Sequence, residues 1–147
     1  MEKNSLWILL AASLLVMLVL TACGGTSPSA PDQNIGVVPE PPAEFAGKIN
    51  PFNGDSAAAE AGKQIYNANC ASCHGLTGMG EGPVAASLNP APKPLARESE
   101  LSDAYLFWRI SAGGGMAPFK SAMPSWKSFL KEEQIWQVIA YLRTLMQ

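Results

Sequence analysis

Residues 67–78 read NANCASCHGLTG, and they hold two of the chain's three cysteines and its only histidine. The spacing Cys70-x-x-Cys73-His74 allows three interpretations: a metal centre, a redox-active dithiol, or covalent attachment of a cofactor. Each interpretation makes a different demand on the rest of the chain. The surrounding sequence therefore decides between them.

Two of these interpretations are disfavoured by what the chain lacks. A structural zinc site takes four cysteine or histidine ligands, but Cys23 lies far from the motif, so only three candidates remain there. A thioredoxin-like dithiol lies at the start of a helix within a βαβ pattern. Here the cysteine pair follows the end of a predicted helix, and no strand pattern accompanies it.

The third interpretation is covalent attachment of haem, for which C-x-x-C-H is the recognised signature. Two cysteines three residues apart on a turn can each form a thioether to one vinyl group of a single haem. The adjacent histidine then lies over the iron. We therefore expect one covalent haem c, attached through Cys70 and Cys73, with His74 as an axial ligand of the iron.

The first 22 residues have the features of an export signal. Lys3 precedes an uncharged apolar run from Leu6 to Leu20, which is shorter than the roughly 20 residues that span a bilayer. Residues 20–23, Leu-Thr-Ala-Cys, resemble the lipobox of bacterial lipoproteins, which implies cleavage after residue 22 and lipidation of Cys23. The alternative is an uncleaved anchor in which Cys23 is an ordinary buried cysteine. Both interpretations tether the chain to a membrane.

Residues 23–54 are predicted to form a linker between the lipidated cysteine and the folded domain. Residues 24–54 hold six of the twelve prolines and show no sustained apolar period, and proline favours extended chain. The alternative is that FAGKINPF, residues 45–52, packs on its own domain or on a partner subunit, because Phe45, Ile49 and Phe52 gain from burial.

Residues 55–147 are expected to form one small all-α domain. Three segments have a helical spacing of apolar residues: residues 56–69, a segment that begins at Ser102, and residues 132–145. The Gly- and Pro-rich stretch 75–94 has no alternating run long enough for a strand. Because a core of three helices is thin for a domain of this size, we expect the haem to act as its staple.

A haem iron with one histidine ligand needs a sixth ligand, and the chain has no second histidine. Methionine is the natural candidate, because its thioether is soft and neutral and raises the potential of haem iron relative to two nitrogen ligands. Two methionines would leave with the leader and one lies at the C-terminal end. Three candidates remain: Met79, Met116 and Met123.

The whole domain resembles the monohaem class I cytochromes c. The motifs that carry the resemblance run in order from residue 55 to 147: AGKQIYNANCASCHG, GEGP, SDAYLFWRISAG, AMPSW and EEQIWQVIAYLRTL. The resemblance implies three main helices with long loops around one haem. It also implies that the axial methionine is Met123, since Pro124 follows it directly. Met116 is the rival ligand, and ordinary core packing is the alternative role for Met123.

The resemblance implies roles for several other residues. Gly62 and Tyr66 match the face of the first helix that crosses the last helix, and Tyr141 lies in the matching segment of the last helix. Gly82-Pro83 resembles the loop whose proline carbonyl accepts a hydrogen bond from the ring of the axial histidine. Pro83 is therefore the expected partner of the His74 ring.

Ligation on both sides of the iron decides the expected function. With His74 and Met123 bound, no position is open to a substrate, and the sequence holds no recognisable catalytic triad or phosphate loop. We expect a carrier of single electrons that is not itself an enzyme. The alternatives are a haem sensor or peroxidase with an open distal site, and a mainly structural haem subunit.

The net charge of −2, without a basic field, argues against a nucleic-acid partner. Lys120, Lys127 and Lys131 cluster around the loop of the proposed ligand Met123 and can steer an acidic redox partner. The alternative is an ordinary solvated charged surface. The lipid anchor, linker and haem domain together resemble monohaem cytochrome subunits of bacterial quinol-oxidising assemblies such as alternative complex III. They also resemble free-standing lipoprotein cytochromes that serve oxidases or photosynthetic reaction centres. Either implies redox partners in a respiratory or photosynthetic chain, at the periplasmic face of a bacterial membrane.

Overall fold

The computed structural model of the chain describes residues 38–146. The expected signal peptide, the lipidation residue Cys23 and the first part of the predicted linker lie outside these residues. Four α-helices follow one another along the described part: α2 (Ser56–Asn69), α3 (Ala71–His74), α4 (Asp103–Ala112) and α5 (Glu132–Leu145). Three 3-10 helices lie in the loops at Ala85–Ser87, Leu95–Arg97 and Trp126–Ser128. No strand occurs among residues 38–146, which confirms the expected all-α class.

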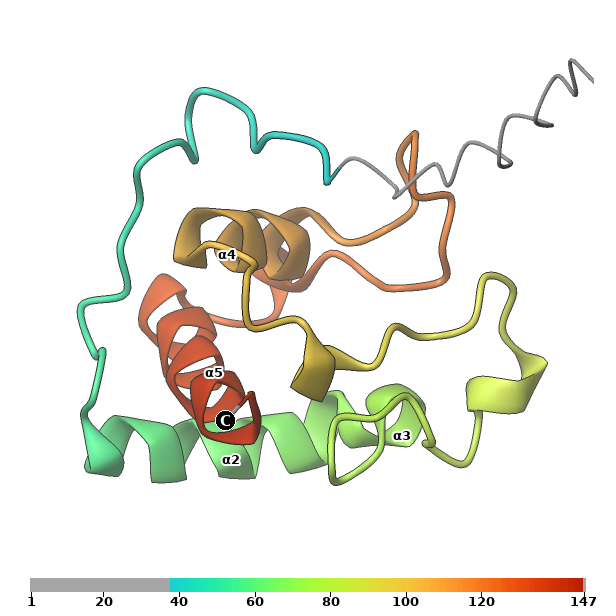
Figure 1. Ribbon diagram of the computed structural model, residues 1–147, viewed down its shortest axis with the longest axis horizontal. Helices are drawn as coiled ribbons and strands as arrows, with labels where there is room; N and C mark the ends of the chain where they lie inside the picture. The colour runs from blue at the N-terminus through green and yellow to red at the C-terminus, as the bar shows by residue number, and fades with distance from the viewer. Residues whose placement is uncertain (1–37, 147) are drawn as a thin grey trace, which may run out of the picture. The chain divides into compact units, whose positions relative to one another are not determined.

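The first and last long helices, α2 and α5, cross at a glycine (Figure 1). A Cβ atom on Gly62 would overlap the backbone of Gln137, so only a residue without a side chain permits this close approach. Tyr66 lies on the same face of α2, and its ring centroid is 5.3 Å from that of Tyr141 in an edge-on arrangement. The predicted crossing face is therefore confirmed.

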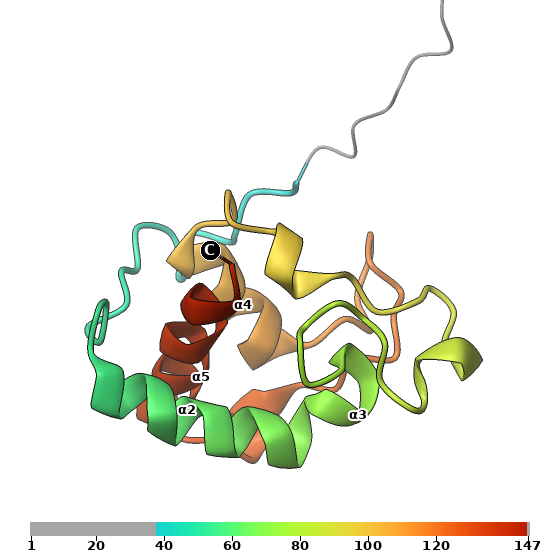
Figure 2. The same cartoon turned by 60° about the horizontal axis from the view of Figure 1, so that its bottom comes forward.

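The side chains of the hydrophobic core come mainly from α2, α4 and α5. The turned view in Figure 2 shows these three helices grouped together. The hydroxyl of Ser102 caps α4 by accepting a hydrogen bond from the amide of Tyr105 at 3.1 Å. Phe107 of α4 stacks on Trp136 of α5 with ring centroids 4.2 Å apart. Ile139 of α5 has no exposed surface. Within the described part of the chain, no helix is both long and apolar enough to cross a membrane.

Residues 39–54, called the strap below, pack on the helices and so are not part of the linker. Asn50 is only 4% exposed, because its side-chain amide donates to the carbonyl of Trp136 at 3.0 Å and its backbone amide donates to Asp103 at 3.0 Å. The ring of Phe45 lies 6.1 Å from that of Phe107. The compact unit runs from Pro39 to the C-terminus. The compact unit therefore begins at Pro39 and not at residue 55, and Phe45 and Phe52 pack against its core.

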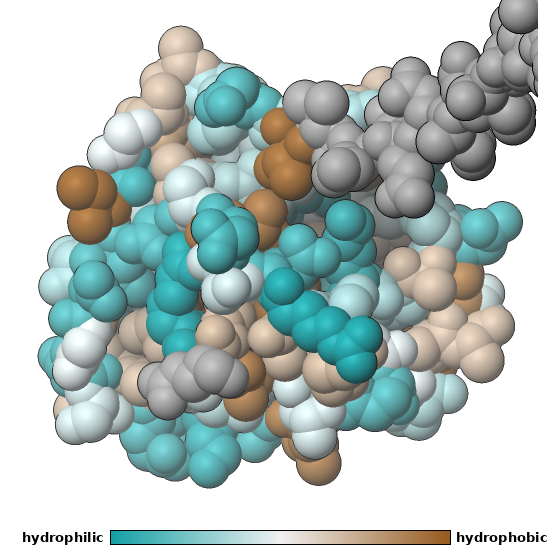
Figure 3. Space-filling view, in the orientation of Figure 1, coloured by the Kyte–Doolittle hydropathy of each residue, from teal (hydrophilic) through white to brown (hydrophobic). Residues whose placement is uncertain are grey.

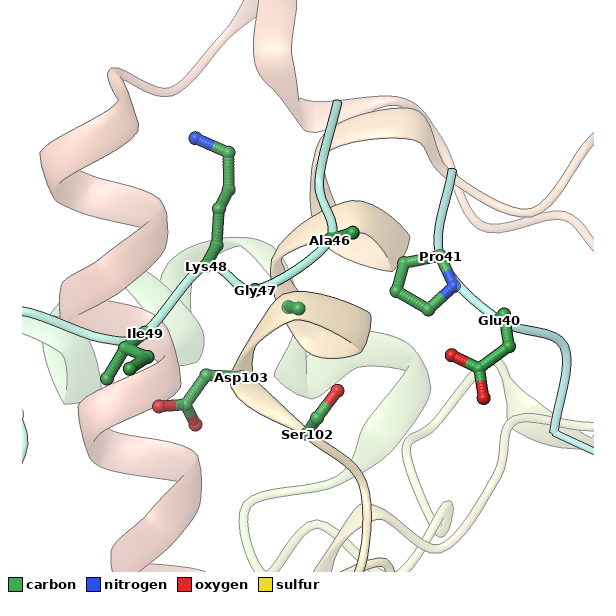
Figure 4. A pocket seen from close by; sticks show the side chains of 9 residues that line it. Glu40, Pro41, Ala46, Gly47, Lys48, Ile49, Ser102 and Asp103 are labelled. Carbon is green, nitrogen blue, oxygen red and sulfur yellow. The ribbon is translucent and has the colours of Figure 1, made fainter. Parts of the chain in front are cut away.

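The ion pair between Asp103 of α4 and Arg143 of α5 also holds the strap, which is hydrogen-bonded to Asp103. One carboxylate oxygen of Asp103 accepts from the Arg143 guanidinium at 2.6 Å, and the other accepts from the amide of Asn50. Arg143 also donates to the carbonyl of Leu101 at 2.6 Å. The strap and the start of α4 line a pocket whose Asp103 carboxylate is thus already engaged (Figure 4). The contacts of Asp103 and Arg143 therefore join three segments that are distant in the sequence.

The loops lie at the opposite end of the domain from the descending part of the strap. In both Figure 1 and Figure 2 the loops before and after α4 lie on the right of the view, as α3 does, while the strap descends on the left. On the face in Figure 3, apolar side chains form separate spots among polar ones. Scattered apolar residues of this kind are normal on a protein surface. The arrangement leaves α3 and the two long loops together at one end.

Candidate cofactor site

The Cys-x-x-Cys-His motif forms one helical turn, α3, directly after α2. The amide of Cys70 donates to the carbonyl of Tyr66 at 2.8 Å and so continues α2 into the motif. The amides of Cys73 and His74 both donate to the carbonyl of Cys70, at 3.1 and 2.9 Å. The backbone that carries the two thiols and the imidazole is therefore fixed from the α2 side.

Both thiols of the motif are unpaired and partly buried. Cys70 packs against the hydrophobic core, and burial, with a smaller contribution from Cys73, raises the pKa of the Cys70 thiol to about 12. A thiol in such apolar surroundings is a poor thiolate nucleophile. Among residues 38–146, no three His, Cys, Asp or Glu side chains lie close enough to share a metal ion. The environment of Cys70 thus favours contact with an apolar group.

The imidazole of His74 is half-buried, and one of its ring nitrogens has a partner. Nδ1 lies 3.4 Å from the backbone carbonyl oxygen of Lys93. Burial lowers the pKa of His74, and the contact with Lys93 raises it by a smaller amount, so the ring is neutral at pH 7. A proton on Nδ1 that points to this carbonyl leaves the lone pair of Nε2 free to bind a metal.

The carbonyl beside the ring of His74 is that of Lys93, and not that of Pro83 as expected. Pro83 is exposed, and the backbone on either side of it contacts the motif itself: Gly82 donates to the carbonyl of Cys73 at 3.2 Å and Val84 donates to that of Ser72 at 3.1 Å. The loop at residue 83 therefore braces the backbone of α3. The expectation for Pro83 is corrected, because a later part of the same loop reaches the ring.

The residue after His74 is fixed by contacts that sequence reasoning missed. The buried hydroxyl of Tyr66 donates to the carbonyl of Gly75 at 2.8 Å. Gly75 has a φ of 75°, and a Cβ atom there would overlap the carboxylate of Glu81. That carboxylate accepts hydrogen bonds from the hydroxyl and amide of Thr77, and the hydroxyl bond is the main cause of the lowered pKa of Glu81. The turn that follows His74 is therefore closed on two sides.

The three candidate methionines lie in different surroundings. Met123 is half-buried and packs against the same core cluster as Cys70. Met116 and Met79 are 41% and 37% exposed. Of the three, Met123 is the one that the fold places at the edge of the core together with the cysteine motif.

The segment around Met123 is tied to the end of α4 on both sides. The backbone carbonyl of Met123 accepts from the amide of Gly114 at 2.9 Å, and the hydroxyl of Ser125 donates to the carbonyl of Ser111 at 2.7 Å. Ser111 is only 3% exposed. Among residues 38–146, its hydroxyl oxygen is the one buried side-chain polar atom without a hydrogen-bond partner. An unpartnered buried hydroxyl is costly unless another molecule satisfies it.

These residues fit a covalently attached haem. The site holds two unpaired thiols on one turn, a neutral imidazole with a free ring nitrogen, and a half-buried thioether at the edge of the same core. Each group is of a type that haem chemistry uses.

Three helices around a Cys-x-x-Cys-His turn define a small class I cytochrome c. Residues 57–142 match the sequence model of the family described as cytochrome c oxidase, cbb3-type, subunit III, and the chain belongs to this family. As a cytochrome c, it binds covalently attached haem c and carries electrons.

Individual relatives agree with this family. The chain is 31% identical over 106 residues to the cbb3-type cytochrome c oxidase subunit CcoP of Azospirillum brasilense, an alignment that covers 70% of this chain and 34% of CcoP. It is 28% identical over 151 residues to cytochrome c550 of Pseudomonas aeruginosa, covering 99% of this chain and 97% of that protein. It is 33% identical over 81 residues to cytochrome c6 of Anabaena variabilis, covering 55% and 84%. The chain thus spans about a third of the length of CcoP but nearly all of cytochrome c550.

A solved structure supports the fold. A chain of the reducing HAO-like protein complex of Kuenenia stuttgartiensis superimposes with a TM-score of 0.55 at 23% sequence identity. The match covers 74% of this chain and 51% of that one. At this level of identity the likeness concerns the fold alone.

Proposed function

We propose that this cytochrome is a closed carrier of single electrons, with haem attached through Cys70 and Cys73 and the iron bound between His74 and Met123. The observation that carries the proposal is the placement of Cys70 and Met123 against one core cluster, with the Nδ1 atom of His74 already engaged by Lys93. The turn at Cys70–His74 and the distant segment around Met123 would thus supply the two sides of one haem site.

The residues of the chain perform three tasks in this proposal. When bound, the haem supplies one iron that accepts and releases a single electron. The carbonyl of Lys93 fixes the ring orientation of His74 and keeps its proton on Nδ1, so Nε2 is the ligand. The neutral thioether of Met123 favours the reduced iron relative to a second nitrogen ligand. With His74 and Met123 both bound to the iron, the site would have no open position for a substrate.

We further propose that the chain works at the periplasmic face of a bacterial membrane. Residues 1–22 would be a cleaved signal peptide, Cys23 the lipidated residue, and the chain from there to the strap a linker. The lipobox-like sequence at residues 20–23 supports this. The similarity to CcoP, by its name an oxidase subunit, supports a place in or beside a larger redox complex. A quinol-oxidising assembly of the alternative complex III type is the partner we favour.

Three lysines form the proposed docking rim for a redox partner: Lys120, Lys127 and Lys131. All three are exposed, and no ion pair joins them to another residue in the described part of the chain. Unpaired cations around a redox site attract an acidic partner surface, and the effect weakens with salt. Charge reversal at these lysines is therefore expected to slow electron transfer at low salt only.

The optical spectrum of the haem-loaded full chain tests the proposed ligation. An oxidised protein with methionine on the iron has a weak sulfur-to-iron band at the red end of the spectrum. We expect this band in the wild type and in Met116→Ala, and its loss in Met123→Ala. A band that survives Met123→Ala and disappears in Met116→Ala would transfer the ligand role to Met116. A wild-type protein without the band would contradict the closed site.

A further inference from the structure

The chain between α4 and Met123 forms a loop whose two ends lie close together. The amide of Gly114 donates to the carbonyl of Met123 at 2.9 Å, and the amide of Ser121 donates to the carbonyl of Gly114 at 2.7 Å. These two hydrogen bonds close the loop at its base. We call residues 113–125 the ligand loop, because it contains the proposed ligand.

The tip of the ligand loop packs back on α4 through one aromatic ring. The guanidinium carbon of Arg109 lies 3.3 Å from the ring centroid of Phe119, and the ring of Trp108 lies edge-on to Phe119 at 5.5 Å. Arg109 also donates to the carbonyl of Gly113 at 2.7 Å, at the point where the loop leaves the helix. A single half-buried cation therefore contacts both the start of the loop and its tip.

This contact stands out because the ligand loop has few other ties to the fold. Its neighbouring side chains are exposed, with Met116 at 41%, and Lys120 has a φ of 47° that serves the turn. A cation over an aromatic face contributes more when it is removed from water, and Arg109 is half-buried and lies near the rings of Trp108 and Phe119. Loss of the stack would leave the loop with the hydrogen bonds at its base, the bond from Ser125 to Ser111 and the packing of Met123. Loops with few contacts open locally at low cost.

We propose that Phe119 and Arg109 are positioning residues that hold the ligand loop closed and so keep the sulfur of Met123 on the iron. The inference rests on the proposed ligand role of Met123. A methionine side chain is flexible, so its backbone must be fixed for its sulfur to stay in place. The backbone of Met123 is hydrogen-bonded to Gly114, directly after the residue that Arg109 holds. The stack thus acts on the ligand through the base of the loop.

The test is displacement of the methionine by imidazole in the oxidised, haem-loaded full chain, followed by loss of the sulfur-to-iron band. Phe119→Ala is expected to raise the apparent affinity for imidazole roughly tenfold, the size of effect that a shielded cation and aromatic pair can have. Phe119→Tyr, which keeps the aromatic face, should stay near the wild type. Phe129→Ala is the matched control, because Phe129 is an aromatic residue on the other side of Met123 that is 75% exposed.

Substitution of Arg109 provides a second test of the same contact. Arg109→Gln should raise the affinity for imidazole to a similar degree, and the double variant with Phe119→Ala should bind imidazole no more tightly than the stronger single variant, because both act on one contact. If the effects of the two substitutions on imidazole affinity are additive, the two residues do not act through one shared contact. If Phe119→Ala does not accumulate as a folded protein, Phe119→Leu keeps an apolar side chain without an aromatic face and gives the same test.

The outcomes separate the two proposals. Equal imidazole affinity in the wild type, Phe119→Ala and Phe129→Ala would overturn the positioning role of Phe119 and Arg109. The sulfur-to-iron band of the untreated protein would then still support Met123 as the ligand. A band that survives Met123→Ala would overturn the assignment of Met123 as ligand. The positioning role of Phe119 and Arg109 would fall with it, because it rests on that assignment. A general loss of stability alone would lower the unfolding temperature of Phe119→Ala without changing its affinity for imidazole relative to Phe129→Ala.

Discussion

The two sides of the proposed haem site are built in different ways. The cysteine and histidine side is one turn that continues α2, and it is braced by backbone hydrogen bonds from the loop at residues 82–84 and by Tyr66. The methionine side is a loop that rests on two backbone hydrogen bonds at its base, two side-chain hydrogen bonds and the stack of Phe119 on Arg109. The comparison indicates a rigid side for attachment and a more easily opened side for the exchangeable ligand.

The largest expected effect comes from removal of the covalent attachment. The double substitution Cys70→Ala and Cys73→Ala should abolish covalent haem nearly completely, and the domain should lose stability because its small helical core needs a staple. Retention of haem after denaturation and gel electrophoresis measures the attachment. Ser72→Ala, between the two cysteines and exposed, is the control. Normal covalent haem in the double variant would show that the rigid side is not the attachment side.

The crossing of α2 and α5 supports the rigid side, so a methyl group there should be damaging. Gly62→Ala places a Cβ atom against the backbone of Gln137, and overpacking of this kind costs about 1–3 kcal/mol or more. Gly115→Ala in the ligand loop is the matched control, because a Cβ atom there meets nothing within 4 Å. Urea unfolding of both variants measures the difference. Equal midpoints would mean that the helices can part without cost.

The hydroxyl of Tyr66 is a smaller brace on the same side. Tyr66→Phe removes the donor to the buried carbonyl of Gly75, and a lost buried hydrogen bond costs about 1 kcal/mol, more where the partner stays unsatisfied. We expect lower stability and faster amide exchange in the turn after His74. Tyr141→Phe removes the hydroxyl of the neighbouring ring and serves as the control. Unchanged exchange at residues 75–80 in Tyr66→Phe would show that this turn does not depend on the hydroxyl.

The smallest expected effect on stability lies on the methionine side. Ser125→Ala removes the hydrogen bond to the carbonyl of Ser111 and should cost about 0.5–1.5 kcal/mol. Because this bond ties the ligand loop to α4, we also expect easier displacement of the methionine by imidazole. Ser128→Ala, exposed and a few residues further on, is a suitable control. A variant that loses stability yet keeps the wild-type imidazole affinity would separate the tie from ligand retention.

The sequence predicted the parts of the fold that depend on local signals. The helices over residues 56–69 and 132–145 have the predicted bounds, because local signals mark them. Asp55 caps the first helix, acidic and basic residues suit the two ends of the last, and both have a helical apolar spacing. The glycine crossing was also predictable, since only a missing side chain allows two backbones to approach so closely. Ser102 likewise marks the start of α4 in both the sequence and the structure.

The missed features depend on contacts between distant residues. The strap was assigned to the linker because its prolines suggest extended chain, whereas the buried contacts of Asn50 are with α4 and α5. The carbonyl of Lys93 was missed because a backbone acceptor leaves no signal in residue type. The stack of Phe119 on Arg109 joins a helix to a loop of irregular shape, and apolar spacing does not report such contacts.

Carbon monoxide binding by the reduced, haem-loaded full chain tests the central claim most directly. A closed site, with the iron held by His74 and Met123, predicts that the wild-type spectrum stays unchanged under carbon monoxide and that Met123→Ala binds the gas readily. Rapid binding by the wild type would contradict the account, because it would show an open axial position and would favour a sensor or peroxidase.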